Sequence, residues 1–286
     1  MKKSFVTLFL GIYVLSTIFF YDNGELEEVH VSAADFGVMC ISAAYPGLSL
    51  ELETETPSEA EPVKGDVEPL QVVTSDYEEK PEPVVFGDEP GVLIVHTHAT
   101  ESYLPASDGN YHTKAQENSV RDVGNVLAKT LEANGIASVH DQTLHDSPSY
   151  NQSYSRSYDT TAELLEKYPS IICVIDLHRD AIASDAPAAT VSVAGKTCAK
   201  YSYVISTEVE TYGDNLKFIN AMNNTAAENF AGFTGKVLER GYRYNQNLSS
   251  RYMLLEIGYN RNDITEARNT AEIFGEILAE TLKAGY

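Results

Sequence analysis

Three short apolar runs, each carrying a histidine or a carboxylate at its end, limit what this chain can fold into. They lie at residues 92–95, 171–177 and 253–257. Each run is too short and too continuously apolar for an amphipathic helix, so it is typical of a strand buried on both faces of a parallel sheet. A sheet of this kind gathers the side chains at its strand ends along one edge.

Segments with helical periodicity separate these runs. The helices are expected at residues 118–134, 155–168, 215–230 and 263–282. Asp263 is the expected N-cap of the last helix. A further strand is expected at residues 136–140. Two more are expected at residues 190–193 and 201–206, and these two should pair with each other through a turn at Gly195. The alternation predicts an α/β domain in which a mostly parallel central sheet carries helices on both faces.

The first part of the chain is expected to hold a membrane anchor at residues 1–21. Lys2 and Lys3 precede the uncharged residues 4–20, a run just long enough to cross a bilayer. The small residues 31–34 resemble a signal-peptide cleavage site, but acidic residues separate them from the apolar run, which favours an uncleaved anchor. Lysines before the span orient the rest of the chain outside the cytoplasm. We therefore expect a single-pass cell-membrane protein with an extracytoplasmic catalytic domain.

Two further segments lie between the anchor and the domain. Residues 22–50 match no clear pattern and stay unassigned. Residues 51–90 hold thirteen acidic residues and six prolines against two lysines, so they contribute much of the net charge of −22. Such a segment cannot bury enough apolar surface to fold, and it is expected to be a disordered, extended tether. The domain that follows, residues 91–286, is only moderately acidic, which argues against nucleic acid as a partner.

The histidines at the strand ends point to metal chemistry. His96 and His98 alternate across the end of the first strand, so only one of them can easily face a given metal. His178 ends the central strand, and the neighbouring Arg179 and Asp180 could orient it or hold substrate. Three cysteines without close spacing describe neither a disulfide framework nor a thiolate zinc site. Imidazole and carboxylate ligands remain, and they suit Zn²⁺.

Carboxylates complete the expected site in two alternative ways. In the first, Glu117 before the helix at 118–134 is the third ligand beside His178 and one of the two histidines His96 and His98, and Glu256 is the catalytic acid and base. A carboxylate among the apolar neighbours of Glu256 would be costly to bury without a role. In the second, Glu101 is the third ligand, in a His-x-x-Glu arrangement, and Glu117 only caps its helix. Zinc bound by three protein ligands keeps a position for an activated water.

A tyrosine-rich stretch at residues 148–158 follows these motifs. Its aromatic rings could stack on sugar or peptide in a groove. Ordinary packing tyrosines in a polar loop explain it equally well.

Taken in order, the motifs resemble the stage II sporulation protein P family of membrane-anchored cell-wall hydrolases. The resemblance runs from Gly91 to Tyr286 and rests on the stretches HTHATESYLP, ENSVRDVG, HDQTLHDSPSYNQSYSRSY, IDLHRDA and LLEIGYNRN. That family is similar to zinc-dependent N-acetylmuramoyl-L-alanine amidases. Carried over, the resemblance implies zinc ligands at His98, Glu117 and His178 and a catalytic Glu256, with HTH replacing a glycine-flanked histidine at the first site.

The resemblance also implies a function. We expect a peptidoglycan amidase, with endopeptidase activity as a possible addition, that acts in engulfment of the forespore during sporulation. The implied partners are stage II sporulation protein D and a membrane protein that localises both. The alternatives are a zinc peptidase acting on stem-peptide crosslinks and a cell-wall-binding module without turnover.

Overall fold

A computed structural model describes residues 17–22, 25–30, 81–106, 110–182 and 186–286, which belong to two compact units. The first unit, within Met1–Thr74, contains strands β1 (Thr17–Asp22) and β2 (Glu25–His30), which pair antiparallel. Most of the predicted anchor and of the acidic linker lies outside the described residues. Of the anchor, only residues 17–21 are described, within β1. Among the described residues, no helix is both long and apolar enough to span a bilayer.

The second unit, Ser75–Tyr286, is built on a six-stranded sheet in the order β4-β3-β5-β10-β8-β9. The strands are β3 (Val92–Val95), β4 (Ser138–His140), β5 (Cys173–Asp180), β8 (Tyr201–Ser206), β9 (Lys236–Arg240) and β10 (Tyr252–Tyr259). All neighbours pair parallel except β10 and β8, which pair antiparallel. The prediction of a mostly parallel sheet is confirmed, and β5 and β10 lie at its centre, where residues are buried on both faces.

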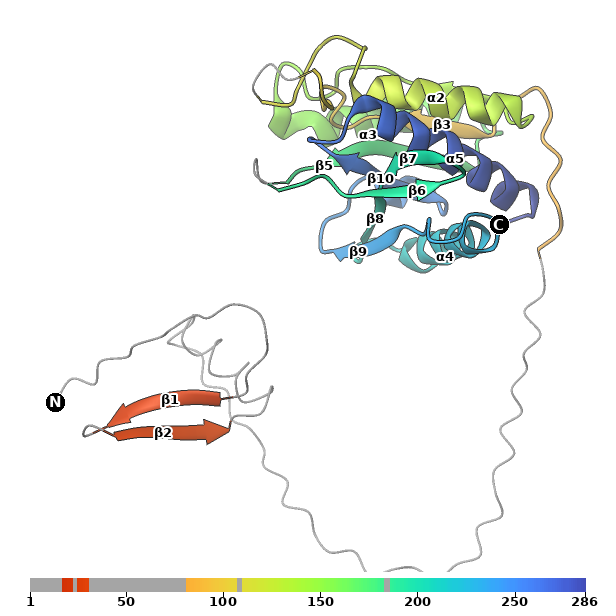
Figure 1. Ribbon diagram of the computed structural model, residues 1–286. Helices are drawn as coiled ribbons and strands as arrows, with labels where there is room; N and C mark the ends of the chain where they lie inside the picture. The colour runs from red at the N-terminus through yellow and green to blue at the C-terminus, as the bar shows by residue number, and fades with distance from the viewer. Residues whose placement is uncertain (1–16, 23–24, 31–80, 107–109, 183–185) are drawn as a thin grey trace, which may run out of the picture. The chain divides into compact units, whose positions relative to one another are not determined.

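Helices cover both faces of this sheet (Figure 1). On one face lie α2 (Val120–Ala133), α4 (Tyr212–Asn229) and α5 (Ile264–Lys283), and on the other lies α3 (Ser153–Lys167). The alternation of side chains along β3 explains this division. Val92 and Ile94 belong to the larger core under α2 and α5, whereas Leu93 and Val95 face the smaller core beside α3. Asp263 caps α5 as predicted, in a capping box with Glu266.

The pairing predicted between residues 190–193 and 201–206 is wrong. Strand β6 (Thr190–Val193) pairs instead with β7 (Lys196–Ala199) through a turn in which Ala194 and Gly195 both have positive φ. Strand β8 leaves this ribbon and joins the central sheet, because its side chains are mostly buried there. Strand β9 has a mixed, mostly exposed sequence at the edge of the sheet and was not predicted.

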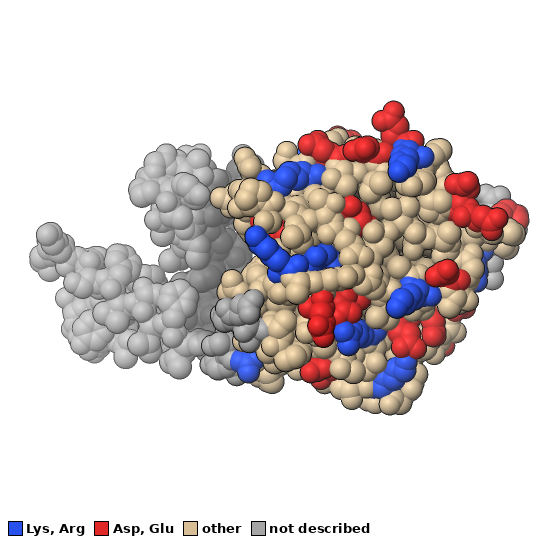
Figure 2. Space-filling model, turned by 90° about the horizontal axis from the view of Figure 1, so that it is seen from above, with Lys and Arg blue, Asp and Glu red and all other residues tan. Residues whose placement is uncertain are grey.

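The last residues of the predicted linker contact the domain. The backbone N–H of Val84 donates to the carbonyl of Lys283 at 2.9 Å, and Phe86 packs against the larger core. The folded unit therefore begins before Gly91. Across the face that Figure 2 shows, basic side chains lie among acidic ones, so its charges are mixed.

Candidate metal and hydrolytic site

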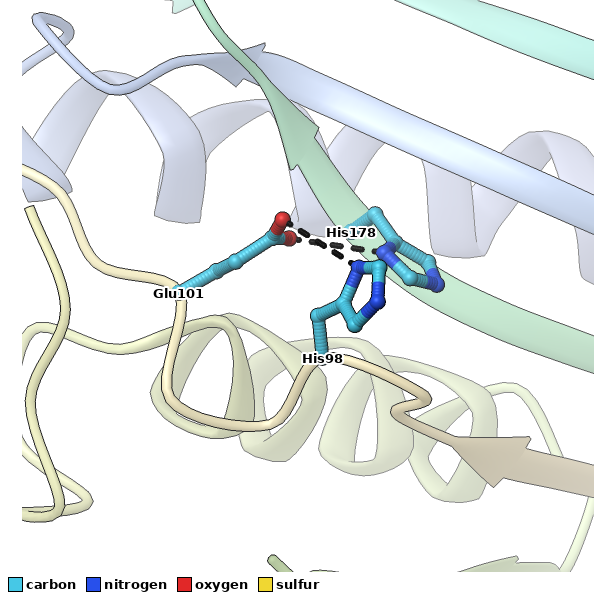
Figure 3. Close-up of side chains that lie close together, drawn as sticks. All are labelled: His98, Glu101 and His178. Carbon is cyan, nitrogen blue, oxygen red and sulfur yellow. Dashed lines mark ion pairs between the residues drawn. The ribbon is translucent and has the colours of Figure 1, made fainter. Parts of the chain in front are cut away.

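Three potential metal ligands meet where β3 and β5 end. His98 and Glu101 lie in the loop that follows β3, and His178 lies near the end of β5 (Figure 3). One ligand atom from each side chain lies within 4.8 Å of the other two. Because β3 and β5 are parallel neighbours, their carboxyl ends meet at one edge of the sheet, as the sequence predicts.

The carboxylate of Glu101 lies between the two imidazoles. Its Oε1 lies 3.7 Å from Nδ1 of His98, and its Oε2 lies 3.4 Å from Nδ1 of His178. The three side chains are only 12%, 7% and 3% exposed, in the order His98, Glu101, His178. Burial opposes the charge on Glu101, but contacts with the two histidines hold the pKa of its carboxyl well below the usual value. The cluster therefore offers an anionic oxygen and two ring nitrogens facing a common point.

Glu256 lies beside this cluster. It is the register partner of His178 on the neighbouring strand β10, and both residues line one cavity of about 310 Å³. Burial raises the pKa of the Glu256 carboxyl to about 8; the nearby Glu101 adds to this shift and His178 opposes it. No donor among the described residues hydrogen-bonds to its buried Oε2. A carboxyl with this pKa and an unpartnered oxygen can accept and release a proton near neutral pH.

Arg179 and Asp180 have different surroundings. The backbone N–H of Arg179 donates to Oε2 of Glu101 at 3.0 Å, and its guanidinium lies 3.5 Å from Oε1. The same guanidinium donates to the carbonyl of Tyr111 at 3.0 Å. Arg179 therefore holds Glu101 and its loop against β5, while Asp180 lines the cavity.

Asp176 supports His178 from behind, a role that the sequence analysis missed. Its Oδ1 lies 2.9 Å from Nε2 of His178, at an angle outside ideal hydrogen-bond geometry. Thr97 donates to the same carboxylate from its N–H and from its hydroxyl, at 2.8 and 2.6 Å. Burial disfavours the charged ring of His178, yet the carboxylates of Asp176 and Glu101 outweigh it and raise its pKa well above the usual value. The two-residue spacing on one strand, which puts both side chains on one face, could have identified Asp176.

Tyrosines cover the open side of His98. The ring of Tyr150 stacks on it at a centroid distance of 4.2 Å, and the Tyr150 hydroxyl lies 3.2 Å from Nδ1. Tyr154 meets the same imidazole edge-on at 5.5 Å. Both belong to the tyrosine-rich stretch noted in the sequence, and both line the cavity. Some of these tyrosines therefore form a wall of the site.

His96 does not join the cluster. It is fully buried, and its Nδ1 donates to the carbonyl of Leu177 at 2.9 Å. Its Nε2 therefore carries no proton and accepts a hydrogen bond from Nε2 of His140 at 2.8 Å. The structure puts the two histidines of HTH in different environments, with His98 in the cavity and His96 in the core below α2.

Glu117 is exposed and is not among the clustered residues. The chain after Glu101 folds back on itself, with bridges from Glu101 to His112 and from Ser102 to Ser119. This return carries the start of α2 past the cluster, so Glu117 precedes its helix on the surface. Of the two ligand sets drawn from the sequence, the structure brings together His98, Glu101 and His178.

Comparison with known proteins gives one family. Residues 22–279 match the family model described as Stage II sporulation protein P. The chain is similar to Stage II sporulation protein P of Bacillus subtilis (strain 168), with 27% identity over 232 residues. The similar region covers 75% of this chain and 57% of that protein.

The chain is also similar to solved structures of amidases, with lower sequence identity. The N-acetylmuramyl-L-alanine amidase Ami1 from Mycobacterium abscessus is 16% identical, with a TM-score of 0.41 over 69% of this chain and 98% of that one. The CwlD amidase from Clostridioides difficile, in complex with the GerS lipoprotein, is 12% identical, with a TM-score of 0.41 over 67% and 98%. Similarity this distant assigns no activity.

Proposed function

Because the chain belongs to the stage II sporulation protein P family, we propose that it is a zinc-dependent peptidoglycan amidase that acts during sporulation. The observation that carries the proposal is the meeting of His98, Glu101, His178 and Glu256 in one cavity. The bond we propose is the amide between N-acetylmuramic acid and L-alanine. The implied role in forespore engulfment follows from the family.

The three clustered residues fit a zinc ion. Ligand atoms bound to zinc at about 2.0–2.2 Å in tetrahedral geometry lie roughly 3.3–3.6 Å apart. Oε2 of Glu101 lies within this range of Nδ1 of His178, at 3.4 Å, and its Oε1 lies slightly beyond it from Nδ1 of His98, at 3.7 Å. Asp176 behind His178 supplies the carboxylate that commonly orients a metal-binding histidine. Two imidazoles and one carboxylate are also a donor set that zinc hydrolases use.

The residues of the chain divide the work of hydrolysis. Bound zinc would supply a polarised water and a positive charge for the developing oxyanion. Glu256 accepts the proton of the attacking water at its unpartnered Oε2 and then delivers it to the departing amide nitrogen. Arg179 keeps Glu101 in position, and the burial of the cluster excludes bulk water from the reacting groups.

Substitution of Glu256 tests this division. Glu256→Gln keeps the shape of the side chain but cannot accept the proton, so we expect hydrolysis of purified cell wall to fall about 10²–10⁴-fold. Zinc content should stay at the wild-type level. Glu228→Gln, on the exposed surface of α4, is the matched control and should leave the rate unchanged. Full activity of Glu256→Gln would refute the proposed role.

Location and partners are further parts of the proposal. We propose that residues 1–21 anchor the chain in the cell membrane with the catalytic domain outside the cytoplasm, supported by the lysines and the uncharged run. Resistance of the protein to alkaline extraction from membranes, lost when residues 1–21 are deleted, would support the anchor. Stage II sporulation protein D and a membrane localising protein remain predicted partners.

A further inference from the structure

The cavity extends well beyond the proposed zinc ligands. From His178 and Glu256 it continues across the sheet face toward β8 and β9. Its lining there is Val204, Leu238 and Leu254, with Arg240, Tyr154 and Tyr244 around them. Leu254, Val204 and Leu238 are neighbours in register on β10, β8 and β9, so they make a continuous apolar floor. We call this part of the cavity the β9 arm.

One wall of the β9 arm is a turn with a strained backbone. Tyr244 and Asn245 are consecutive residues with φ of 49° and 57°, in the left-handed region that a bulky tyrosine rarely adopts. The Asn245 side chain holds this turn by donating to the carbonyl of Tyr154 and to the hydroxyl of Ser157, both at 3.0 Å. Backbone strain of this kind persists where the surroundings enforce it and is concentrated at functional sites.

The strained turn arranges three tyrosines in a row. Tyr244 meets Tyr154 at a centroid distance of 5.7 Å and Tyr242 at 5.9 Å. Tyr242 is 71% exposed, which makes it one of few large apolar side chains of the described chain left open to solvent. The row therefore leads from the imidazole of His98 through Tyr154 to the outer surface.

Arg240 gives the arm its charge. Arg179, the other arginine of the cavity, is held by Glu101, but Arg240 has no carboxylate within ion-pair distance among the described residues. Its guanidinium donates only to the neighbouring carbonyl of Glu239, at 2.9 Å. The guanidinium of Arg240 is exposed and has no ion-pair partner among the described residues, so it can bind a carboxylate on a ligand through two parallel hydrogen bonds.

The distance along the sheet selects the part of the substrate that reaches Arg240. Arg240 lies two strands away from Glu256 and four residues further along, which separates the two backbones by roughly 16 Å at normal strand spacing and rise. An extended tripeptide spans about 10–11 Å, and the arginine side chain covers the remainder. In peptidoglycan, free carboxylates lie on the stem peptide, since the lactyl carboxyl of the glycan is engaged in the amide to be cleaved.

We propose that the β9 arm is the subsite for the stem peptide and that Arg240 binds a carboxylate on its second or third residue. This inference rests on the proposed amidase function. The peptide would lie over Val204, Leu238 and Leu254, along the tyrosine row, with the glycan on the opposite side of the zinc ligands.

The test compares substrates that differ by one charge. The full chain is given an N-acetylmuramoyl tripeptide with free carboxylates and two counterparts amidated at the second or the third residue. For the wild type, amidation of one of these residues should raise KM about 10-fold or more, the loss expected for a charge-assisted hydrogen bond. Arg240→Gln should raise KM for the free form by a similar factor and remove the difference between the substrates, with kcat little changed.

A neighbouring arginine provides the control. Arg243 is exposed in the turn that follows β9, lies 3.9 Å from Glu210 and does not line the cavity, so Arg243→Gln should behave as the wild type. An equal increase in KM in both variants would overturn the subsite. So would a wild type whose KM is unchanged by either amidation.

A binding measurement separates this inference from the proposed function. Calorimetric titration of the Glu256→Gln chain, with and without Arg240→Gln, with the free and amidated N-acetylmuramoyl tripeptides requires no turnover. If Arg240→Gln weakens binding but the wild type does not hydrolyse the substrate, the subsite is supported and the amidase function is refuted. If the wild type hydrolyses the substrate and Arg240→Gln changes neither hydrolysis nor binding, the amidase function is supported and the subsite is refuted.

Discussion

His96 and His98 are separated by one residue, yet they have unrelated roles. Alternation along the chain turns His96 into the core, where its two ring nitrogens are both hydrogen-bonded, and leaves His98 at the cavity. Sequence alone could predict that only one of them faces a metal, but not which one. The choice depends on His140, which comes from a strand 44 residues away.

Glu101 and Glu117 are the two alternatives for the third zinc ligand, and their substitution distinguishes them. Glu101→Gln removes the charge that lies between the two imidazoles, so we expect the chain to lose zinc affinity by at least about 10-fold. Glu117→Gln alters an exposed side chain and should keep the zinc content of the wild type. Metal analysis after dialysis against a weak chelator measures both. The reverse order, with zinc lost only from Glu117→Gln, would contradict the assignment.

At the scale of elements, α2 packs unusually close to the paired histidines. Gly124 of α2 faces the His96–His140 pair, and a Cβ at this position would lie 2.5 Å from Nε2 of His140 and 3.0 Å from Nε2 of His96. Both imidazoles are already fixed by hydrogen bonds, so neither can move without loss. The close approach of α2 to β3 and β4 therefore requires glycine here.

Alanine substitution of two helical glycines, one at this contact and one away from it, tests the close packing. Gly124→Ala should lower the free energy of unfolding by about 1–3 kcal/mol, the usual effect of overpacking a buried site. Gly213→Ala, in the first turn of α4 with no atom near the added Cβ, should leave stability unchanged or raise it by up to about 1 kcal/mol through helix propensity. Urea unfolding monitored by circular dichroism compares them. Similar effects of the two substitutions would contradict the close packing of α2.

The same histidine pair predicts a pH dependence of stability. Burial lowers the pKa of His140 to about 4, and burial with the neighbouring His140 lowers that of His96 well below the usual 6.5. Between pH 6.5 and 4 the unfolded chain then binds more protons than the folded one, so the free energy of unfolding falls on acidification. The contribution of His140 is up to about 3 kcal/mol over this window and none above it.

A glutamine can separate this effect from other titrations. His140→Gln keeps a donor for Nε2 of His96 but cannot be protonated, so its stability should fall less steeply from pH 6.5 to 4 than that of the wild type. Urea unfolding at pH 7.5, 5.5 and 4.5 gives the two slopes. Parallel curves for the two proteins would show that His140 does not titrate in this window.

The elements differ in how far the sequence predicted them. The buried strands β3, β5 and β10 and the capped helix α5 were predicted, because continuous apolar runs and the Asp263 cap are local signals. Strand β9 was missed, since an exposed edge strand lacks such a run. The partner of β6 was wrong because pairing is decided by tertiary packing, and the β9 arm depends on residues from several separate segments.

In the molecule as a whole, the folded domain brings distant segments of the chain together around the cavity that we propose as the hydrolytic site. The proposed zinc ligands come from the ends of β3 and β5, the proposed proton acceptor Glu256 comes from β10, and the aromatic wall comes from the region of α3. The parallel order β3-β5-β10 brings these ends to one edge. The proposed activity would therefore depend on the sheet topology as well as on the individual residues.

Mass analysis of the products released from purified cell wall shows which bond the chain cleaves and whether cleavage requires zinc. With the full chain and zinc, we expect stem peptides that begin with L-alanine and glycan strands with free lactyl carboxyls, and we expect neither after treatment with a strong chelator or with Glu256→Gln. Cleavage within the peptides alone would indicate an endopeptidase. Release of the same products at an undiminished rate in the presence of the chelator would contradict the zinc amidase.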